Sequence, residues 1–170
     1  MKVYYHTLGC KVNQYQTAAI EGILAENGFT AVQEPQQADV IVVNSCTVTS
    51  QSDMKTRREV RHLKALRPGC CLVLTGCMVQ ADPACAAKLP QADIIAGVND
   101  AKLIPGMIKD FFAGNSEKQI AKITPHDRSE KYGNEKVTSF DGRTRAYIKI
   151  QDGCDRYCTY CIIPTAIGPS

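Results

Sequence analysis

The 170-residue sequence lacks the features that would place it in several common classes of protein. It contains no G-x-G-x-x-G and no Walker-type phosphate loop, so a nucleotide-binding fold of either kind has no support. It has no apolar run long enough to cross a membrane, and its first residues show no signal-peptide pattern. We therefore expect a cytoplasmic protein without a membrane partner. The net charge of +3 is too small to imply nucleic-acid binding by itself.

Cysteine, by contrast, is abundant, with nine residues in the chain. Cytosolic thiols stay reduced, so clustered cysteines there more often bind metal or carry out chemistry than form disulfides. Cys154, Cys158 and Cys161 form a C-x3-C-x2-C run that follows a predicted strand, with no fourth cysteine or histidine nearby. Three thiolates can hold an iron–sulfur cluster while leaving one iron without a protein ligand. An open iron can bind a small molecule, which indicates a chemical site.

Two other interpretations of this run stay open. A structural zinc site needs four ligands, and only three are close in sequence. Cys158 and Cys161 also match a thioredoxin-type C-x-x-C, which needs no third cysteine four residues upstream. The alternatives are therefore a non-catalytic iron–sulfur or zinc scaffold and a thiol–disulfide oxidoreductase.

Strand and helix patterns alternate over residues 1–113, which predicts an α/β domain. Separated strands imply right-handed crossovers. We expect a flavodoxin-like, mainly parallel, five-stranded sheet with helices on both faces. Asn13 is predicted to cap the first helix. Strands are expected at residues 3–7, 29–32, 40–43, 72–75 and 93–96, and helices at about 13–27, 53–66, after 82–83, and 102–112.

The rest of the chain divides into a polar segment and the start of a second domain. Residues 114–142 are broken by glycine and proline and are predicted to be a linker, with a short strand or two. Residues 145–150 alternate with period two, which predicts the first strand of a second domain over 143–170. The cysteine run follows this strand.

A second set of cysteines is spread through the first domain. Cys10, Cys46 and Cys77 each follow a predicted parallel strand directly. The carboxyl ends of parallel strands form the edge where ligands bind, so these thiols should converge. Gly9 and Gly76 would let the backbone approach a bulky inorganic group closely. The sequence therefore predicts a second iron–sulfur site, while Cys70, Cys71 and Cys85 are expected to be small buried residues.

Residues 53–67 carry a local excess of positive charge. They hold six basic and two acidic residues, a balance of +4. A solvated helix face explains this pattern, and a strip facing RNA phosphates is the alternative.

These motifs together resemble the radical S-adenosylmethionine (SAM) methylthiotransferases. The closest branch is the one that modifies threonylcarbamoyladenosine in tRNA. The resemblance covers nearly the whole chain. It is carried by residues 6–14 (HTLGCKVNQ), 44–49 (NSCTVT), 75–77 (TGC) and 150–154 (IQDGC), and by the C-x3-C-x2-C run with an aromatic before its last cysteine.

The resemblance implies two [4Fe–4S] clusters, one held by Cys10, Cys46 and Cys77 and the other by Cys154, Cys158 and Cys161. SAM would chelate the open iron of the second cluster, with Tyr160 near its adenine. Reductive cleavage would start a radical reaction that inserts a methylthio group at C2 of N6-threonylcarbamoyladenosine. The implied partners are tRNA and an electron-donor protein. Residues 143–170 would begin a truncated radical SAM barrel, so this chain should not turn over alone.

The chain departs from the family pattern just after Cys161. Thr165 stands where the family commonly has an aromatic residue, and Ile167 where it has arginine. The resemblance therefore does not support SAM or RNA contacts from these two positions.

Overall fold

A six-stranded, wholly parallel sheet forms the centre of the computed structural model, which describes residues 1–114, 119–127, 137 and 147–170. The strand order is β2-β1-β3-β4-β5-β6. Its first five strands follow the flavodoxin-like order, in which the switch point lies between β1 and β3. The strands are β1 (Lys2–Thr7), β2 (Thr30–Ala31), β3 (Val40–Ser45), β4 (Cys71–Gly76), β5 (Ile94–Ala96) and β6 (Ile120–Lys122).

The sequence predicted this fold class and all five of the strands that it placed in the first domain. β3 and β4 are buried over their full lengths, as expected for strands covered on both faces. The added strand, β6, lies inside the 114–142 segment that was predicted to be a linker. It pairs with β5 from Ile94–Ile120 to Ala96–Lys122 and so extends the sheet at the far edge.

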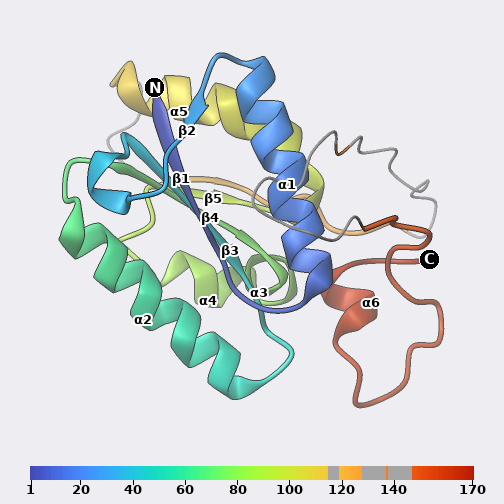
Figure 1. Cartoon of the computed structure of the whole chain (residues 1–170). Coiled ribbons are helices and arrows are strands. Elements are labelled where there is room, and N and C mark those ends of the chain that lie inside the picture. The colour runs from blue at the N-terminus through green and yellow to red at the C-terminus, as the bar shows by residue number, and fades with distance from the viewer. Residues whose placement is uncertain (115–118, 128–136, 138–146) are drawn as a thin grey trace.

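Helices cover both faces of the sheet (Figure 1). On one face, Ile20 and Leu24 of α1 and Ile104 and Ile108 of α5 share a core with the strands. On the other face, α2 and the α4 region pack against the alternate strand residues. The helices are α1 (Lys11–Glu26), α2 (Ser50–Leu66), α3 (Cys77–Ala81), α4 (Pro83–Ala87), α5 (Ile104–Phe112) and α6 (Ile163–Ala166), with 3-10 turns η1 (Pro35–Gln37) and η2 (Val98–Leu103).

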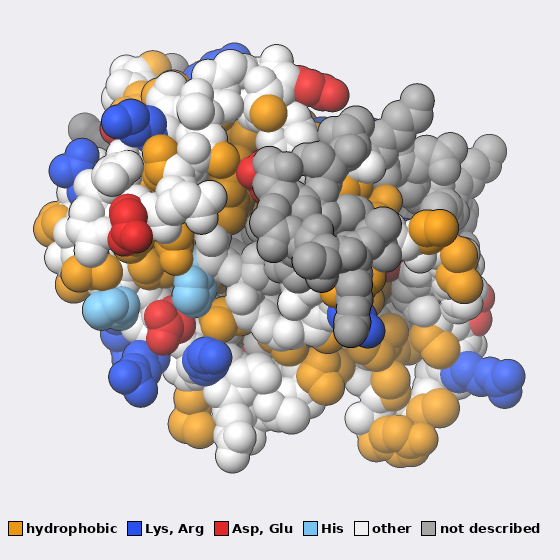
Figure 2. Space-filling model, viewed as in Figure 1, with side chains coloured by type: hydrophobic (Ala, Val, Ile, Leu, Met, Phe, Trp, Pro, Cys, Tyr) orange, Lys and Arg blue, Asp and Glu red, His pale blue; other side chains and the backbone are white. Residues whose placement is uncertain are grey.

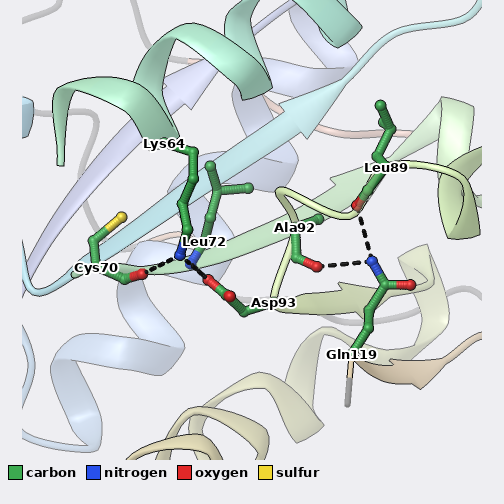
Figure 3. A network of polar contacts seen from close by, with 7 residues as sticks. All are labelled: Lys64, Cys70, Leu72, Leu89, Ala92, Asp93 and Gln119. Atoms are coloured by element: carbon green, nitrogen blue, oxygen red, sulfur yellow. Dashed lines mark hydrogen bonds and ion pairs between the residues drawn. The ribbon is translucent and has the colours of Figure 1, made fainter. Parts of the chain in front are cut away.

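The amino edge of the sheet is fastened by a polar network (Figure 3). The Lys64 ammonium donates to the Cys70 carbonyl at 2.7 Å and pairs with Asp93 Oδ2 at 2.6 Å. The same carboxylate oxygen accepts from the Leu72 N–H, and Gln119 donates to the carbonyls of Leu89 and Ala92. These contacts join α2, β4 and the entries to β5 and β6. The opposite, carboxyl edge is where the early cysteines lie.

Three local expectations need correction. Asn13 does not cap α1: the N-cap residue is Cys10, and Asn13 lies inside the helix, fully buried. The strand predicted over 145–150 is absent from its described part, 147–150, while 145 and 146 lie outside the described residues. A strand needs a paired neighbour and a core for alternate side chains, whereas Ile148 and Ile150 are 87% and 89% exposed. The short helices α3 and α6 were not predicted.

Candidate functional site

The loops after β1, β3 and β4 bring Cys10, Cys46 and Cys77 to the carboxyl edge of the sheet. β3 lies between β1 and β4, so the three loops are neighbours. Cys10 precedes the first turn of α1, Cys46 follows the last residue of β3, and Cys77 begins α3. Cys10 is exposed, whereas Cys46 and Cys77 are 5% and 4% exposed. The set therefore runs from the surface into the interior. We call these three residues the N-terminal triad.

A single buried side chain, that of Asn13, links the triad. The Cys10 thiol donates to Asn13 Oδ1 at 3.3 Å, and Asn13 Nδ2 lies 3.8 Å from Cys77 Sγ. Asn13 Nδ2 also donates to the Ser45 carbonyl at 2.7 Å, directly before Cys46. The convergence that the strand positions predicted is therefore present. Cluster binding by these thiols stays a prediction.

Two glycines allow this close approach. Gly9 has φ +108°, and a Cβ there would lie 2.7 Å from Cys46 Cβ and 2.9 Å from Cys46 Sγ. Gly76 has φ +96°, and its Cβ would lie 2.2 Å from Asn44 Oδ1 and 2.5 Å from the Ser45 carbonyl. Both positions combine a left-handed backbone with a close contact. In the structure these glycines allow close approach of neighbouring protein atoms, whereas their predicted role in the approach of an inorganic group stays a prediction.

Burial and neighbouring thiols make Cys77 a poor acid in the metal-free chain. Desolvation first, and then Cys46 and Cys10, raise the pKa of Cys77 from its ordinary 9.0 to about 11, while the Asn13 hydrogen bond opposes the shift. Three thiolates this close would repel each other without a cation among them. The triad therefore suits a cationic inorganic group that takes the place of the protons.

Among the described residues, no three His, Cys, Asp or Glu side chains are close enough to form a ready-made site for a single metal ion. A four-iron cluster is much larger than one ion and spreads its thiolate ligands further apart. The N-terminal triad fits the larger group in ligand type and in number. It does not form a compact four-ligand zinc site.

The second set, Cys154, Cys158 and Cys161, lies on one loop near the C-terminus. The Cys154 N–H donates to the Gly168 carbonyl at 3.1 Å, which closes the base of the loop. The Cys161 N–H donates to the Cys158 carbonyl at 2.9 Å, which forms a turn between these two cysteines. Cys158 is exposed, and the other two are partly buried. We call this set the C-terminal triad. Its ligand type and number fit a cluster with one open iron.

The two triads lie at the same end of the molecule. α3, which begins at Cys77, packs against α6, which begins two residues after Cys161 (Figure 1). Pro164 and Ala166 of α6 are buried in this contact region. A cavity of about 300 Å³ lies beside it, lined by residues of α3, of the 125–127 segment and of the C-terminal loop.

Cation–π contacts hold the C-terminal segment to the start of α1. The Lys11 ammonium lies 5.9 Å from the centre of the Tyr147 ring, and the Lys149 ammonium lies 5.4 Å from that of Tyr15. In the first pair the lysine lies on α1 and the tyrosine on the C-terminal segment, and in the second pair the positions are reversed. Such contacts contribute about 0.5–1 kcal/mol each at exposed positions. They support a defined placement of residues 147–149 beside α1, although no strand forms there.

Tyr160, expected near the adenine of SAM, is 91% exposed at the tip of the C-terminal loop. Tyr157 beside it is half exposed, with φ +46°. Hydrophobic side chains gather over this loop at the lower right of Figure 2. Of the two departures from the family pattern, Thr165 lines the cavity of about 300 Å³, and Ile167 closes α6. No described contact of Tyr160 indicates a ligand, so its role stays a prediction.

The six basic residues of the 53–67 segment differ in their surroundings, and Arg57 is partly buried. Lys64 is committed to Asp93, and Arg67 Nε donates to the Ala38 carbonyl at 3.2 Å, so both hold the fold together. Lys55, Arg58 and Arg61 are exposed. Figure 2 shows basic side chains with histidines over the α2 region at the lower left. Three of the six basic residues therefore form an exposed charged surface, fewer than the sequence count suggested.

Asn13 is the site residue that sequence reasoning missed. Its position three residues after Cys10 places both on the same face of one helical turn, which is the signal that could have found it. Asn is a poor helix former and a good cap, and this preference led to the wrong assignment. By contrast, Cys70 and Cys71 are buried at the amino end of β4, as expected of structural residues. Nothing is described for the side chain of Cys85.

Residues 2–97 match the family described as "Uncharacterized protein family UPF0004", and the chain belongs to that family. It is also similar to curated tRNA-modifying enzymes. It is 40% identical over 98% of its length to "Threonylcarbamoyladenosine tRNA methylthiotransferase MtaB" of Bacillus subtilis, and 35% identical over 98% to the protein of that name from Thermotoga maritima. It is 31% identical over 99% to "tRNA-2-methylthio-N(6)-dimethylallyladenosine synthase" of Hydrogenobaculum.

The alignments cover only part of these relatives. The chain spans 36% of the length of the Bacillus and Thermotoga proteins and 39% of the Hydrogenobaculum protein. The resemblance to methylthiotransferases is thereby confirmed for the whole chain. Within the part of the chain that the structure describes, no helix has both the length and the apolar character needed to cross a membrane.

Proposed function

We propose that this chain is the N-terminal part of a cytoplasmic tRNA methylthiotransferase that inserts a methylthio group at C2 of N6-threonylcarbamoyladenosine by radical SAM chemistry. Two [4Fe–4S] clusters would serve it, one at each triad, with reducing electrons from a donor protein. Residues 1–113 would form the sulfur-inserting domain, 114–142 the connection and 143–170 the start of the radical SAM domain. The branch rests on the 40% identity to the Bacillus protein, which exceeds the 31% to the Hydrogenobaculum protein.

The observation that carries the proposal is the placement of two cysteine triads at one end of the fold. The N-terminal triad converges from three strands around Asn13, and α6 brings the C-terminal triad's loop against α3. A structural metal site needs one set of ligands at four-fold coordination. Two sets of three, on loops joined through the contact of α3 with α6, favour two groups that act on one substrate.

Each triad would contribute differently. Cys154, Cys158 and Cys161 would hold a cluster, which would supply an electron and an open iron for the reductive cleavage of SAM. The exposed loop leaves Cys158 and Tyr160 accessible, so a cofactor can reach this triad from solvent. The N-terminal triad keeps Cys46 and Cys77 away from water and exposes Cys10 alone. This arrangement would limit hydrolytic loss of a sulfur-donating group and leave a single opening toward the substrate.

RNA contact would involve the exposed basic surface of Lys55, Arg58 and Arg61. α2, which carries this surface, begins four residues after Cys46 and so continues from the loop that holds this member of the N-terminal triad. Replacing these three residues by glutamate should weaken tRNA binding and reduce its salt dependence, because fewer counterions are released. The matched control replaces Lys88, Lys102 and Lys109, which are exposed on other elements and give the same change in net charge. Equal effects of the two sets would remove α2 from the proposal.

The direct test separates the roles of the two triads in the full-length enzyme. After anaerobic reconstitution with reductant, SAM and tRNA, Cys46→Ala should still cleave SAM to 5′-deoxyadenosine but should form no methylthio product. Cys158→Ala should do neither. Cys70→Ala is the matched control, because it removes a buried thiol at the other edge of the sheet and should retain both activities.

Two outcomes would contradict this assignment. Loss of SAM cleavage in Cys46→Ala while the C-terminal cluster remains would show that the two triads do not have separate roles. Modification of tRNA by Cys158→Ala would remove the C-terminal triad from the reaction. Using tRNA that carries dimethylallyladenosine in place of threonylcarbamoyladenosine tests the branch, and preference for that substrate would reject it.

A further inference from the structure

Asn13 occupies a position that is unusual for its residue type. It lies inside helix α1, where asparagine is a poor helix former, and it is fully buried. Buried amides persist only when their polar atoms have partners. The partners of the Asn13 side chain belong to β3 and to the N-terminal triad, not to the backbone of α1. These contacts account for an asparagine at this position.

The orientation of the Asn13 amide follows from its contacts. The atom 2.7 Å from the Ser45 carbonyl must be the NH₂ group, because a carbonyl oxygen only accepts. The same nitrogen lies 3.2 Å from Asn44 Oδ1 and 3.8 Å from Cys77 Sγ. Oδ1 therefore faces Cys10, whose thiol donates to it at 3.3 Å, and it also lies 4.0 Å from Cys77 Sγ, whose thiol can donate to it. Asn13 also accepts from Asn44 Nδ2 through its own carbonyl at 2.9 Å, which fixes α1 to β3.

Cys46 is linked to Asn13 through Gly9. A Cβ at Gly9 would lie 2.9 Å from Cys46 Sγ and 3.0 Å from Asn13 Oδ1, so both atoms lie against the side of Gly9 where a side chain would be. Asn13 thus contacts two of the thiols, and its Oδ1 and the third thiol both lie near the space beside Gly9 that a side chain would fill.

We propose that Asn13 is the positioning residue of the N-terminal triad, and that its amide N–H donates to the Cys77 sulfur when the triad holds an iron–sulfur cluster. This inference rests on the cluster assignment made under the proposed function. Metal-bound cysteines are thiolates, which accept hydrogen bonds but cannot donate them. On cluster binding the Cys10 donor is lost, and the Nδ2 contact with Cys77 becomes a charge-assisted hydrogen bond. Such bonds to cluster sulfurs stabilise the reduced form, and partners of ligands also govern metal affinity.

The test replaces one atom group while keeping the shape of the side chain. Asn13→Asp removes the N–H donor and places a carboxylate beside the thiolates. The background is the full chain with Cys154, Cys158 and Cys161 changed to alanine, so that only the N-terminal cluster is observed. Asn13→Asp should lose iron to a chelator about 10–100-fold faster, the range typical of partners of metal ligands. Its reduction potential, followed by EPR during a redox titration, should shift to more negative values.

The matched control is Asn27→Asp, at the other end of α1. The Asn27 amide donates only to the Ile23 carbonyl at an exposed position, so the same chemical change should leave iron retention and potential unaltered. If Asn13→Asp does not fold, Asn13→Ser provides both measurements, since its shorter hydroxyl cannot reach Cys77 and Ser45 together. Wild-type iron retention and wild-type potential in the folded variant would overturn the positioning role. Absence of iron from the background protein itself would instead reject the cluster assignment.

Discussion

The two triads supply the same ligands but are built in opposite ways. The N-terminal triad is assembled from three loops up to 67 positions apart in sequence, and its thiols converge only because a parallel sheet places the loops side by side. The C-terminal triad occupies a single stretch of eight residues, and a closing hydrogen bond from Cys154 to Gly168 and one internal turn shape it. One site is a property of the fold, and the other is a property of a local segment.

This difference has consequences for stability and exposure. A substitution that disturbs the carboxyl edge of the sheet should displace the cysteines of the N-terminal triad and leave the C-terminal loop unaffected. Conversely, the C-terminal loop presents Cys158 and Tyr160 to solvent, whereas Cys46 and Cys77 are enclosed. The enclosed site suits a reagent that must be protected from water, and the open one suits a cofactor that must enter and leave.

The largest effect is expected from Gly76→Ala. The new Cβ would meet Asn44 Oδ1 and the Ser45 carbonyl in a left-handed backbone conformation, which should destabilise the metal-free chain by about 3 kcal/mol or more. Gly22→Ala is the matched control, because Gly22 lies within α1 with nothing within 4 Å of its added Cβ. That change should stabilise the chain by about 0.5–1 kcal/mol. Thermal unfolding measures both, and equal melting temperatures would contradict the account of this edge.

The next largest effect is a difference in alkylation rate between a thiol of the C-terminal triad and one of the N-terminal triad. In the metal-free chain, iodoacetamide should alkylate Cys158 at least about 100-fold faster than Cys77. A rise in the pKa of Cys77 from 9.0 to about 11 alone lowers its thiolate fraction by about that factor near neutral pH, and burial adds to the protection. Timed alkylation followed by peptide mass spectrometry gives the ratio. Similar rates would mean that Cys77 is not enclosed.

The smallest effect is a pH dependence of the unfolding free energy that arises from His6, at the N-terminal end of the chain. Burial lowers the pKa of His6 below 6.5, against the opposing effect of Glu59, whose Oε2 lies 3.8 Å from His6 Nε2. Below pH 6.5 the unfolded chain takes up a proton that the folded chain resists. The contribution to stability is therefore complete above pH 6.5 and is lost as the pH falls toward the folded pKa. His6→Gln should flatten this part of the curve of unfolding free energy against pH. An unchanged slope would contradict it.

The sequence predicted most of the fold, because the determinants are local. Continuous apolar runs at 40–43 and 72–75 mark strands buried on both faces, and residues that follow parallel strands share an edge. These two facts were enough to predict that Cys10, Cys46 and Cys77 lie at the same edge of the sheet. The role of Asn13 could not be found in this way, since it depends on contacts with β3 and with residues up to 64 positions away. The strand expected to include residues 147–150 did not form for a related reason. Alternating residues favour an extended backbone, but a strand also needs a neighbouring strand to pair with, which the sequence pattern does not reveal.

The sequence also could not show that Lys64 and Arg67, unlike the exposed basic residues nearby, make contacts that hold the fold together. A count of charges treats six residues alike, whereas Lys64 reaches Asp93 across the amino edge of the sheet and Arg67 reaches Ala38. Both contacts join positions 29 residues apart. A charge pattern identifies a candidate surface, and only the fold shows which of its members are already engaged.

Iron stoichiometry tests the central claim of two independent cluster sites most directly. After anaerobic reconstitution the wild-type chain should bind about eight irons, two clusters of four. Replacing Cys154, Cys158 and Cys161 by alanine, or Cys10, Cys46 and Cys77, should each leave about four, whereas replacing Cys70 and Cys71 should leave the wild-type value. One equivalent of zinc without visible charge-transfer absorption would contradict the account. So would the loss of all iron on removal of the C-terminal triad.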